Sequence, residues 1–167
     1  MNKVSWKKLE KENLKGKIFL LPTDTVYGFH ALVDDVSAIK NIVKIKKRKE
    51  RKYFINLIAE ISDLKKFDIK INENQKKFLE KIWPGKVTII FTDVNGEKKS
   101  FRIPAHRKLR NFIKKIGPII STSANRSGEL PIFEPDKLST ALKNNVDFYI
   151  DEGSLKSKPS TILELIR

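Results

Sequence analysis

The chain is a series of short apolar runs separated by amphipathic helical segments, and this alternation limits the fold more than any other feature. The runs expected to form strands are Ile18–Leu21, Phe54–Ala59, Val87–Phe91, Ser100–Ile103, Ile119-Ile120, Phe148–Ile150 and Thr161–Leu165. Helices are expected at residues 3–15, from about residue 36 onwards, and at residues 62–67, 72–83, 106–116 and 135–144. Strands that interleave with helices indicate an α/β or α+β domain. The Asn95-Gly96 turn adds an antiparallel hairpin, so the sheet should be mixed and twisted.

Composition narrows the class of protein. The 167 residues fit one domain with a sizeable core, over residues 1–167. No apolar run approaches the roughly 20 residues of a membrane helix, and no signal peptide is evident, so a cytoplasmic location is expected. The lack of cysteine excludes disulfides and thiolate metal sites. The net charge of +15 either attracts polyanions such as nucleic acid or reflects compositional bias, and both readings stay open.

Residues 21–28, LPTDTVYG, form the first candidate site segment, because polar residues follow directly on an expected strand. Sheets of the α/β class place ligands where strand ends open into polar loops. A turn closed by threonine or Asx hydrogen bonds gives the same pattern. This segment alone therefore leaves both readings open.

The second segment is residues 44–52, KIKKRKERK, in which seven of nine residues are basic. If the preceding helix continues, one face carries Lys44, Lys47, Arg48 and Arg51, with Lys46 partly round from it. Such a face is either a solvated helix end or a cradle for phosphate or carboxylate. If these cations are exposed, Lys46→Ala and Arg48→Ala should lose turnover with little change in melting temperature.

Two further segments place polar side chains in or after expected strands. Thr88 lies inside a strand, where its hydroxyl needs a hydrogen-bond partner, and Arg102 lies near the end of another. The polar residues that follow Ile119-Ile120 are Ser121, Thr122, Ser123, Asn125 and Ser127. A loop of this composition offers hydroxyls and N–H groups to an anion, although an ordinary polar turn also fits.

The candidate segments lack the signatures of several enzyme classes. The sequence has no G-x-x-x-x-G-K-[ST] loop, no G-x-G-x-x-G fingerprint and no G-x-S-x-G elbow. The sequence has only two histidines, which is a poor basis for a zinc site or a catalytic triad. The Lys, Arg, Ser, Thr and Asn side chains instead suit a reaction among anionic substrates, in which catalysis is positioning and charge neutralisation.

Six stretches, taken in order, resemble the YrdC family of threonylcarbamoyl-adenylate synthases in its single-domain, TsaC-like form. They are PTDTVYG (22–28), KKR (46–48), WPGKVT (83–88), RIP (102–104), TSANRSG (122–128) and PST (159–161). Each stretch is weak alone, but six in this order at compatible spacing are specific. The resemblance implies a YrdC-like α/β fold, an open twisted sheet of mixed direction flanked by helices, with a basic concave face.

The activity implied by the resemblance is a nucleotidyltransferase reaction. L-threonine, bicarbonate and ATP would give threonylcarbamoyl-adenylate and pyrophosphate, with Mg²⁺ on the triphosphate. A separate transferase would then modify tRNA; direct contact with tRNA stays open. The catalytic residues carried over are Lys46, Arg48, Ser123 and Asn125. Threonine or bicarbonate contacts fall on Thr23, Lys52 and Ser160, and nucleotide contacts on Thr88, Arg102 and Ser121; no metal-ligating residue is implied.

The chain departs from the family pattern at two places. The family usually reads Y-G-L-G, whereas Gly28 is followed here by Phe29 and His30. We interpret His30 as a packing or surface residue in preference to a pocket residue. Prolines common in the basic loop are replaced by Lys49 and Tyr53. An RNA-binding module of the same fold without catalysis is the alternative function, motivated by the charge of +15.

Overall fold

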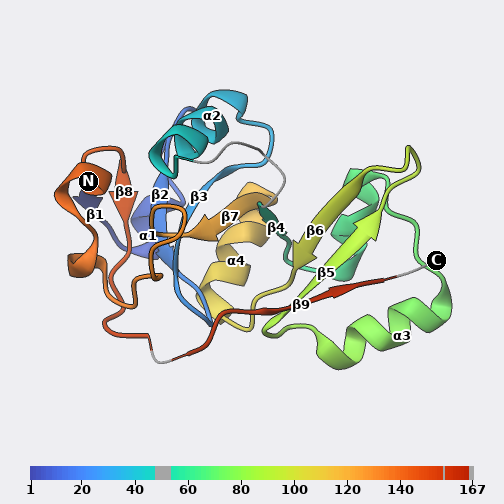
Figure 1. Ribbon diagram of the computed structural model, residues 1–167. Coiled ribbons are helices and arrows are strands. Elements are labelled where there is room, and N and C mark those ends of the chain that lie inside the picture. Colours follow the sequence, from blue (N-terminus) through green and yellow to red (C-terminus); the bar gives the residue numbers. More distant parts are fainter. Residues whose placement is uncertain (48–53, 156, 166–167) are drawn as a thin grey trace.

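A computed structural model describes residues 1–47, 54–155 and 157–165, and within these ranges nine strands form one sheet (Figure 1). The strands are β1 (Asn2–Lys3), β2 (Phe19–Pro22), β3 (Tyr27–Leu32), β4 (Ile55–Leu57), β5 (Val87–Thr92), β6 (Lys98–Arg102), β7 (Ile119–Ser123), β8 (Phe148–Tyr149) and β9 (Thr161–Glu164). Their order is β1-β8-β2-β3-β7-β4-β6-β5-β9. The β2–β3, β3–β7, β4–β7 and β5–β6 pairs are antiparallel, and the others are parallel. The predicted mixed sheet is therefore confirmed.

The helices begin where the sequence provides caps. They are α1 (Trp6–Leu9), α2 (Val36–Ile45), α3 (Glu73–Ile82), α4 (Arg107–Ile116) and α5 (Thr140–Lys143), with the 3-10 helices η1 (Ile61–Phe67) and η2 (Pro135–Lys137). Asp35 caps α2, and Asn72 caps α3 in a capping box with Gln75. His106 caps α4 by accepting a hydrogen bond from the Leu109 backbone. None of the helices in the described ranges combines the length and hydropathy of a membrane span.

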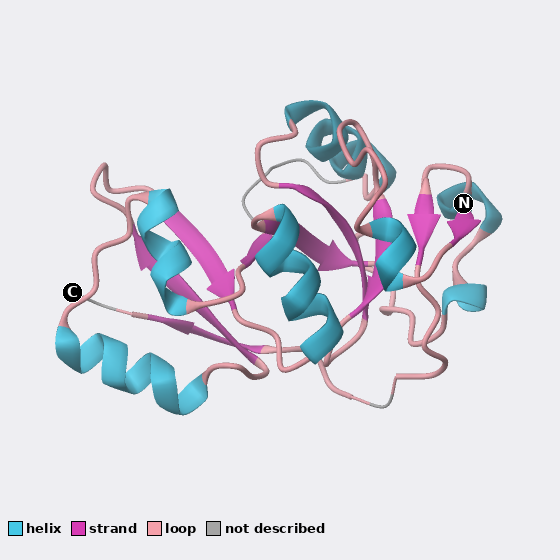
Figure 2. Cartoon of the chain, turned by 180° about the vertical axis from the view of Figure 1, so that it is seen from behind, coloured by secondary structure: helices cyan, strands magenta, loops and turns pink. Residues whose placement is uncertain are grey.

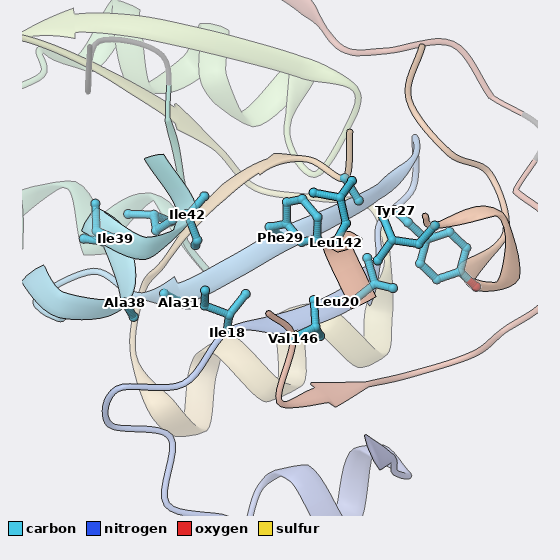
Figure 3. Packing of buried hydrophobic residues seen from close by; sticks show 13 residues of the cluster. Ile18, Leu20, Tyr27, Phe29, Ala31, Ala38, Ile39, Ile42, Leu142 and Val146 are labelled. Carbon is cyan, nitrogen blue, oxygen red and sulfur yellow. The ribbon is translucent and has the colours of Figure 1, made fainter. Parts of the chain in front are cut away.

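The helices cover the sheet through three apolar clusters. On one face, Ile39 and Ile42 of α2 pack against Phe29 of β3 (Figure 3). On the other face, Phe112 of α4 packs against Phe19 of β2, and α4 lies over the middle of the sheet in Figure 2. A third cluster joins η1 and α3 to β5 and β6. Alternate residues of a strand face opposite sides, so β2 serves both of the first two clusters.

Several predicted boundaries are wrong. The helix expected over residues 3–15 is only Trp6–Leu9, and the one expected over 135–144 is divided into η2 and α5 by the extended residue Leu138. Strand β3, over Tyr27–Leu32, was not expected at all, because Gly28 and His30 interrupt its apolar pattern. Since β3 is the partner of both β2 and β7, it is central to the sheet.

The basic segment also differs from its prediction. Helix α2 ends at Ile45, Lys46 is its C-cap, and Lys47 has a left-handed φ of 51°. The shared basic helical face that includes Lys44 and Lys47 is therefore wrong, because the chain has left the helix before Lys47. Strand β7 in turn runs on through Ser123, so Ser121 to Ser123 lie on the strand instead of in a loop after it.

Candidate active site

A cleft of about 200 Å³ lies between strands β3, β7 and β4, the β2–β3 loop, and the segment that enters β9. Its polar lining consists of Thr23, Thr25, Arg102, Ser121, Thr122, Ser123 and Ser160. Val26, Ile55 and Leu57 contribute apolar surface. The cleft thus gathers residues predicted for the catalytic, threonine and nucleotide groups, although they lie up to 137 positions apart in the chain, from Thr23 to Ser160.

Lys46 lies behind the cleft and is fully buried. Its Nζ donates hydrogen bonds to the backbone oxygens of Ser123, at 2.5 Å, and Asn125, at 2.8 Å, and to Asn125 Oδ1, at 3.0 Å. Three donations match the three N–H groups of an ammonium. Ser123 Oγ donates to the same Asn125 Oδ1 at 2.5 Å. The premise that Lys46 is an exposed charge is wrong, because a turn wraps round its ammonium.

Lys46, Ser123 and Asn125 are therefore brought together as one hydrogen-bonded cluster. Ser123 is the member that lines the cleft, while Lys46 and Asn125 lie behind it. Arg48 and Lys52, the other two predicted basic residues, lie outside the described residues. The cluster can orient the Ser123 hydroxyl, because its acceptor Asn125 Oδ1 is itself held by Lys46.

Arg102 is the second buried cation at the cleft, with 4% of its surface exposed. Its Nε donates to the Gly85 carbonyl at 3.0 Å, Nη1 to Thr25 Oγ1 at 3.2 Å, and Nη2 to the Asp24 carboxylate. Burial lowers the pKa of the guanidinium, and the charge of Asp24 opposes this effect. Arginine nevertheless stays protonated at any physiological pH.

Asp24 is a site residue that had no role in the sequence-based prediction. Its second carboxylate oxygen accepts from the Ala105 backbone N–H at 3.1 Å, so the residue fixes both Arg102 and the chain that follows β6. The sequence shows only an acid within the PTDTVYG stretch and, far along the chain, an arginine near the end of an expected strand. Long-range pairing of this kind cannot be read from either segment alone.

Thr88 and Thr23 are held by the hydrogen bonds that their positions require. Thr88 is fully buried, and its Oγ1 lies 2.9 Å from Ser160 Oγ, which supplies the partner expected for a hydroxyl inside the sheet. Thr88 thus supports Ser160 and does not itself line the cleft. Thr23 Oγ1 donates to the Val26 carbonyl at 2.8 Å and accepts from the Thr25 N–H at 3.0 Å. Both readings of this segment hold, since the turn is also part of the cleft wall.

His30 is a packing residue, as expected, but it packs beneath the cleft. It is fully buried, and its Nε2 lies 3.1 Å from Ser121 Oγ. Burial lowers the pKa of His30 to about 3, so the imidazole is neutral near pH 7. Among the residues that the structure describes, no group of three or more His, Cys, Asp or Glu side chains is placed to hold a metal ion.

Comparisons with known proteins identify the family of this chain. The family model named for Sua5, YciO and YrdC, described as telomere recombination, matches residues 13–167. The chain belongs to the Sua5/YciO/YrdC family. The membership predicted from the six motifs is thereby confirmed.

Relatives within the Sua5/YciO/YrdC family carry a common name. A Methanocaldococcus jannaschii protein, provisionally named a threonylcarbamoyl-AMP synthase, is 33% identical over 94% of this chain and 78% of its own. The threonylcarbamoyl-AMP synthase of Blochmanniella pennsylvanica is 27% identical over 91% of this chain and 84% of its own.

Solved structures of the family share the fold. P. abyssi Sua5 complexed with L-threonine superposes with a TM-score of 0.85 at 24% identity, over 98% of this chain. E. coli YciO gives a TM-score of 0.84 at 21% identity, over 97% of this chain and 84% of its own. The chain spans about half the length of the P. abyssi protein, 53% of it. These two likenesses establish the fold.

Proposed function

We propose that this chain is a threonylcarbamoyl-AMP synthase that makes threonylcarbamoyl-adenylate and pyrophosphate from L-threonine, bicarbonate and ATP. The observation that carries the proposal is the cleft, which collects hydroxyls and one guanidinium in a chain whose curated relatives bear that name. The structure of P. abyssi Sua5 complexed with L-threonine supports a threonine site in the family.

The proposed reaction has two steps, neither of which needs a covalent enzyme intermediate. The neutral amine of threonine attacks the carbon of bicarbonate, and loss of water leaves a carbamate. A carbamate oxygen then attacks the α-phosphorus of ATP, and pyrophosphate leaves. Both reactants of the second step are anionic, so the protein must bring them together against their repulsion.

The described residues divide into two groups in this proposal. Thr23 and Ser160 contact threonine, with Thr88 supporting Ser160 from behind. Arg102 and Ser121 contact the nucleotide. Arginine has five N–H groups, so a guanidinium oriented by Gly85, Thr25 and Asp24 can still donate to a phosphate oxygen.

The tetrad carried over from the family acts at the reacting atoms in the proposal. The Ser123 hydroxyl donates its proton to Asn125 Oδ1, so its oxygen can accept from a substrate N–H such as the threonine amine without adding charge. Lys46 and Asn125 hold that hydroxyl in place. Arg48 completes the tetrad, and Lys52 contacts the carboxylate of threonine. These last two assignments rest on the motif alone, since both residues lie outside the described ranges.

Mg²⁺ enters the proposal as part of the ATP substrate. Magnesium is typically bound by substrate phosphates and water with one or two carboxylates, so no dedicated protein cage is required. Asp24 is the carboxylate beside Arg102, but its oxygens already accept from Arg102 and the Ala105 N–H. The chain would work in the cytoplasm and pass its product to a separate tRNA transferase.

The test is incubation of the folded protein with ATP, Mg²⁺, bicarbonate and labelled threonine. We expect pyrophosphate and a labelled threonylcarbamoyl nucleotide, each dependent on all three substrates. Arg102→Ala should abolish both products, and Lys114→Ala, at a side chain with 72% exposure, should not. A folded wild-type protein that binds tRNA and yields neither product would favour the RNA-binding alternative and overturn the proposal.

A further inference from the structure

His30 lies in a second layer, directly beneath the floor of the cleft. It pairs across the antiparallel β3–β7 ladder with Ser121, so the two side chains share one face of the sheet. A Cβ atom built on Gly28 would lie 2.8 Å from His30 Cε1 and 3.2 Å from Nε2. The imidazole therefore occupies the space under Gly28. Gly28 and Ser121 both line the cleft, whereas His30 is completely covered.

The two ring nitrogens of His30 have different surroundings. Nε2 lies 3.1 Å from Ser121 Oγ. Nδ1 is buried and makes no hydrogen bond to any residue that the structure describes. The backbone oxygens of Phe19 and Gly28 act on the ring and partly oppose the fall in its pKa, but neither forms a hydrogen bond with Nδ1. A proton on Nδ1 would therefore be a buried N–H donor without a well-formed hydrogen bond, and such donors are rare in proteins. The proton consequently belongs on Nε2.

We propose that His30 is a positioning residue whose Nε2–H donates to Ser121 Oγ and so directs the Ser121 hydroxyl proton into the cleft. A serine oxygen that accepts from His30 keeps its own O–H for another acceptor. The ligand group it would meet is a phosphate oxygen of the bound nucleotide, an acceptor that takes strong, charge-assisted hydrogen bonds. This inference rests on the proposed function only for the identity of that ligand.

The arrangement also accounts for the residue type at position 30. A histidine held neutral by burial has a fixed donor that a serine or threonine hydroxyl would not provide, because a hydroxyl can rotate. The pKa of about 3 keeps that donor unchanged over the physiological range. With an apolar side chain at position 30, nothing at that position would fix the direction in which the Ser121 hydroxyl donates.

The tautomer can be tested without any substrate. Nitrogen-15 NMR of histidine-labelled protein, with His106→Asn to assign the two rings, should show His30 protonated at Nε2 and bare at Nδ1. The signals should not change between about pH 5 and 8, the window in which an unperturbed histidine titrates. A proton on Nδ1, or a cationic ring within that window, would overturn the proposal.

The positioning role is tested by steady-state kinetics on four variants. We expect His30→Leu and Ser121→Ala each to raise KM for ATP about tenfold, the size of one lost hydrogen bond to a charged group. Their double variant should be no worse than either single one. His30→Gln, which keeps a side-chain N–H, should recover much of the loss, and KM for threonine should stay within twofold in all of them.

The outcomes separate this inference from the proposed function. If wild-type protein makes no product, the proposed function is wrong, but the tautomer measurement still tests the role of His30. Active wild-type protein together with an unchanged ATP KM in His30→Leu removes the positioning role. Equal rises in the KM values for ATP and threonine would also overturn it, because they would indicate general damage to the cleft.

Discussion

Lys46 and Arg102 are both cations buried against the same cleft, but they hold different segments of the chain in place. The Lys46 ammonium donates to oxygens of Ser123 and Asn125, at the end of β7 and in the turn that follows it. Arg102 joins the β2–β3 loop, through Asp24 and Thr25, to the Gly85 carbonyl in the segment between α3 and β5. Lys46 therefore shapes one wall of the cleft, whereas Arg102 connects two walls. A buried charge can organise a local turn or a long-range junction, and mutation should distinguish the two.

The largest effect is expected for Lys46→Ala. The change removes three hydrogen bonds at this turn, although the Ser123 carbonyl keeps the Asn125 N–H and Asn125 Oδ1 keeps Ser123 Oγ as donors. The loss should cost about 3 kcal/mol of the free energy of unfolding. In a chain of this size that is a fall in melting temperature of roughly 6–12 °C. Differential scanning calorimetry measures it. Turnover should be lost as well, because Lys46 no longer holds Asn125 Oδ1, the acceptor of the Ser123 hydroxyl.

Lys44→Ala is the matched control, because Lys44 is an exposed lysine on the same helix two residues earlier. It should change the melting temperature by no more than a degree or two, corresponding to about 0.5 kcal/mol. If Lys46→Ala behaves like Lys44→Ala, the ammonium does not organise the turn and the contrast with Arg102 is lost.

The next effect is the coupling between Arg102 and Asp24. A double-mutant cycle with Arg102→Ala and Asp24→Ala should give a coupling free energy of about 2–3 kcal/mol, because both partners are almost fully buried. The exposed pair Lys3–Asp151 supplies the control, and its coupling should be much smaller than that of Arg102 and Asp24. Urea unfolding of the four proteins in each cycle provides the numbers. Equal couplings in the two cycles would contradict a junction role for Arg102.

These two cations also mark the limit of what the sequence reveals. The mixed sheet, the Asn95-Gly96 hairpin and the helix starts near residues 36 and 72 follow from local patterns, and the structure confirms them. The motifs likewise identified residues that the fold brings to one cleft. Local patterns of this kind depend on neighbours in the chain, so they can be predicted without knowledge of the tertiary structure.

The burial of Lys46 and the pairing of Asp24 could not be predicted in that way. A lysine among seven basic residues has the appearance of a solvated surface, and only the left-handed residue Lys47 after it turns the chain away. Strand β3 escaped prediction because Gly28 and His30 lower its apparent β propensity. All three misses are tertiary effects, in which contacts between distant segments override the local sequence.

His30 extends the comparison to a buried base that is held neutral. Its folded-state pKa of about 3 lies below the value of about 6.5 in an unfolded chain. Below pH 6.5 the unfolded chain therefore binds a proton that the folded protein refuses, and stability falls as the pH decreases toward 3. Between pH 6.5 and 5 the loss attributable to His30 should be about 1.5 kcal/mol.

The measurement is urea unfolding of wild type and His30→Gln across that pH range. The variant should lack this part of the acid slope, while His106→Asn, which keeps a capping side chain on α4, should retain it. An identical slope in wild type and His30→Gln would mean that His30 can be protonated in the folded protein. His30 would then be a buried cation, like Lys46, and not a neutral hydrogen-bond donor.

The smallest effect is expected at Thr88, whose hydroxyl contacts Ser160 without any charge. Thr88→Val keeps the volume and removes the 2.9 Å hydrogen bond, so stability should fall by about 1 kcal/mol. Ser160 would then be less well oriented, and KM for threonine should rise about threefold while KM for ATP stays unchanged. Thr88→Ser keeps the hydroxyl and should leave KM for threonine near the wild-type value. If Thr88→Ser raises KM for threonine as much as Thr88→Val does, the methyl group and not the hydroxyl positions Ser160. The uncharged hydrogen bond would then contribute nothing comparable to the contacts of Lys46 and Arg102.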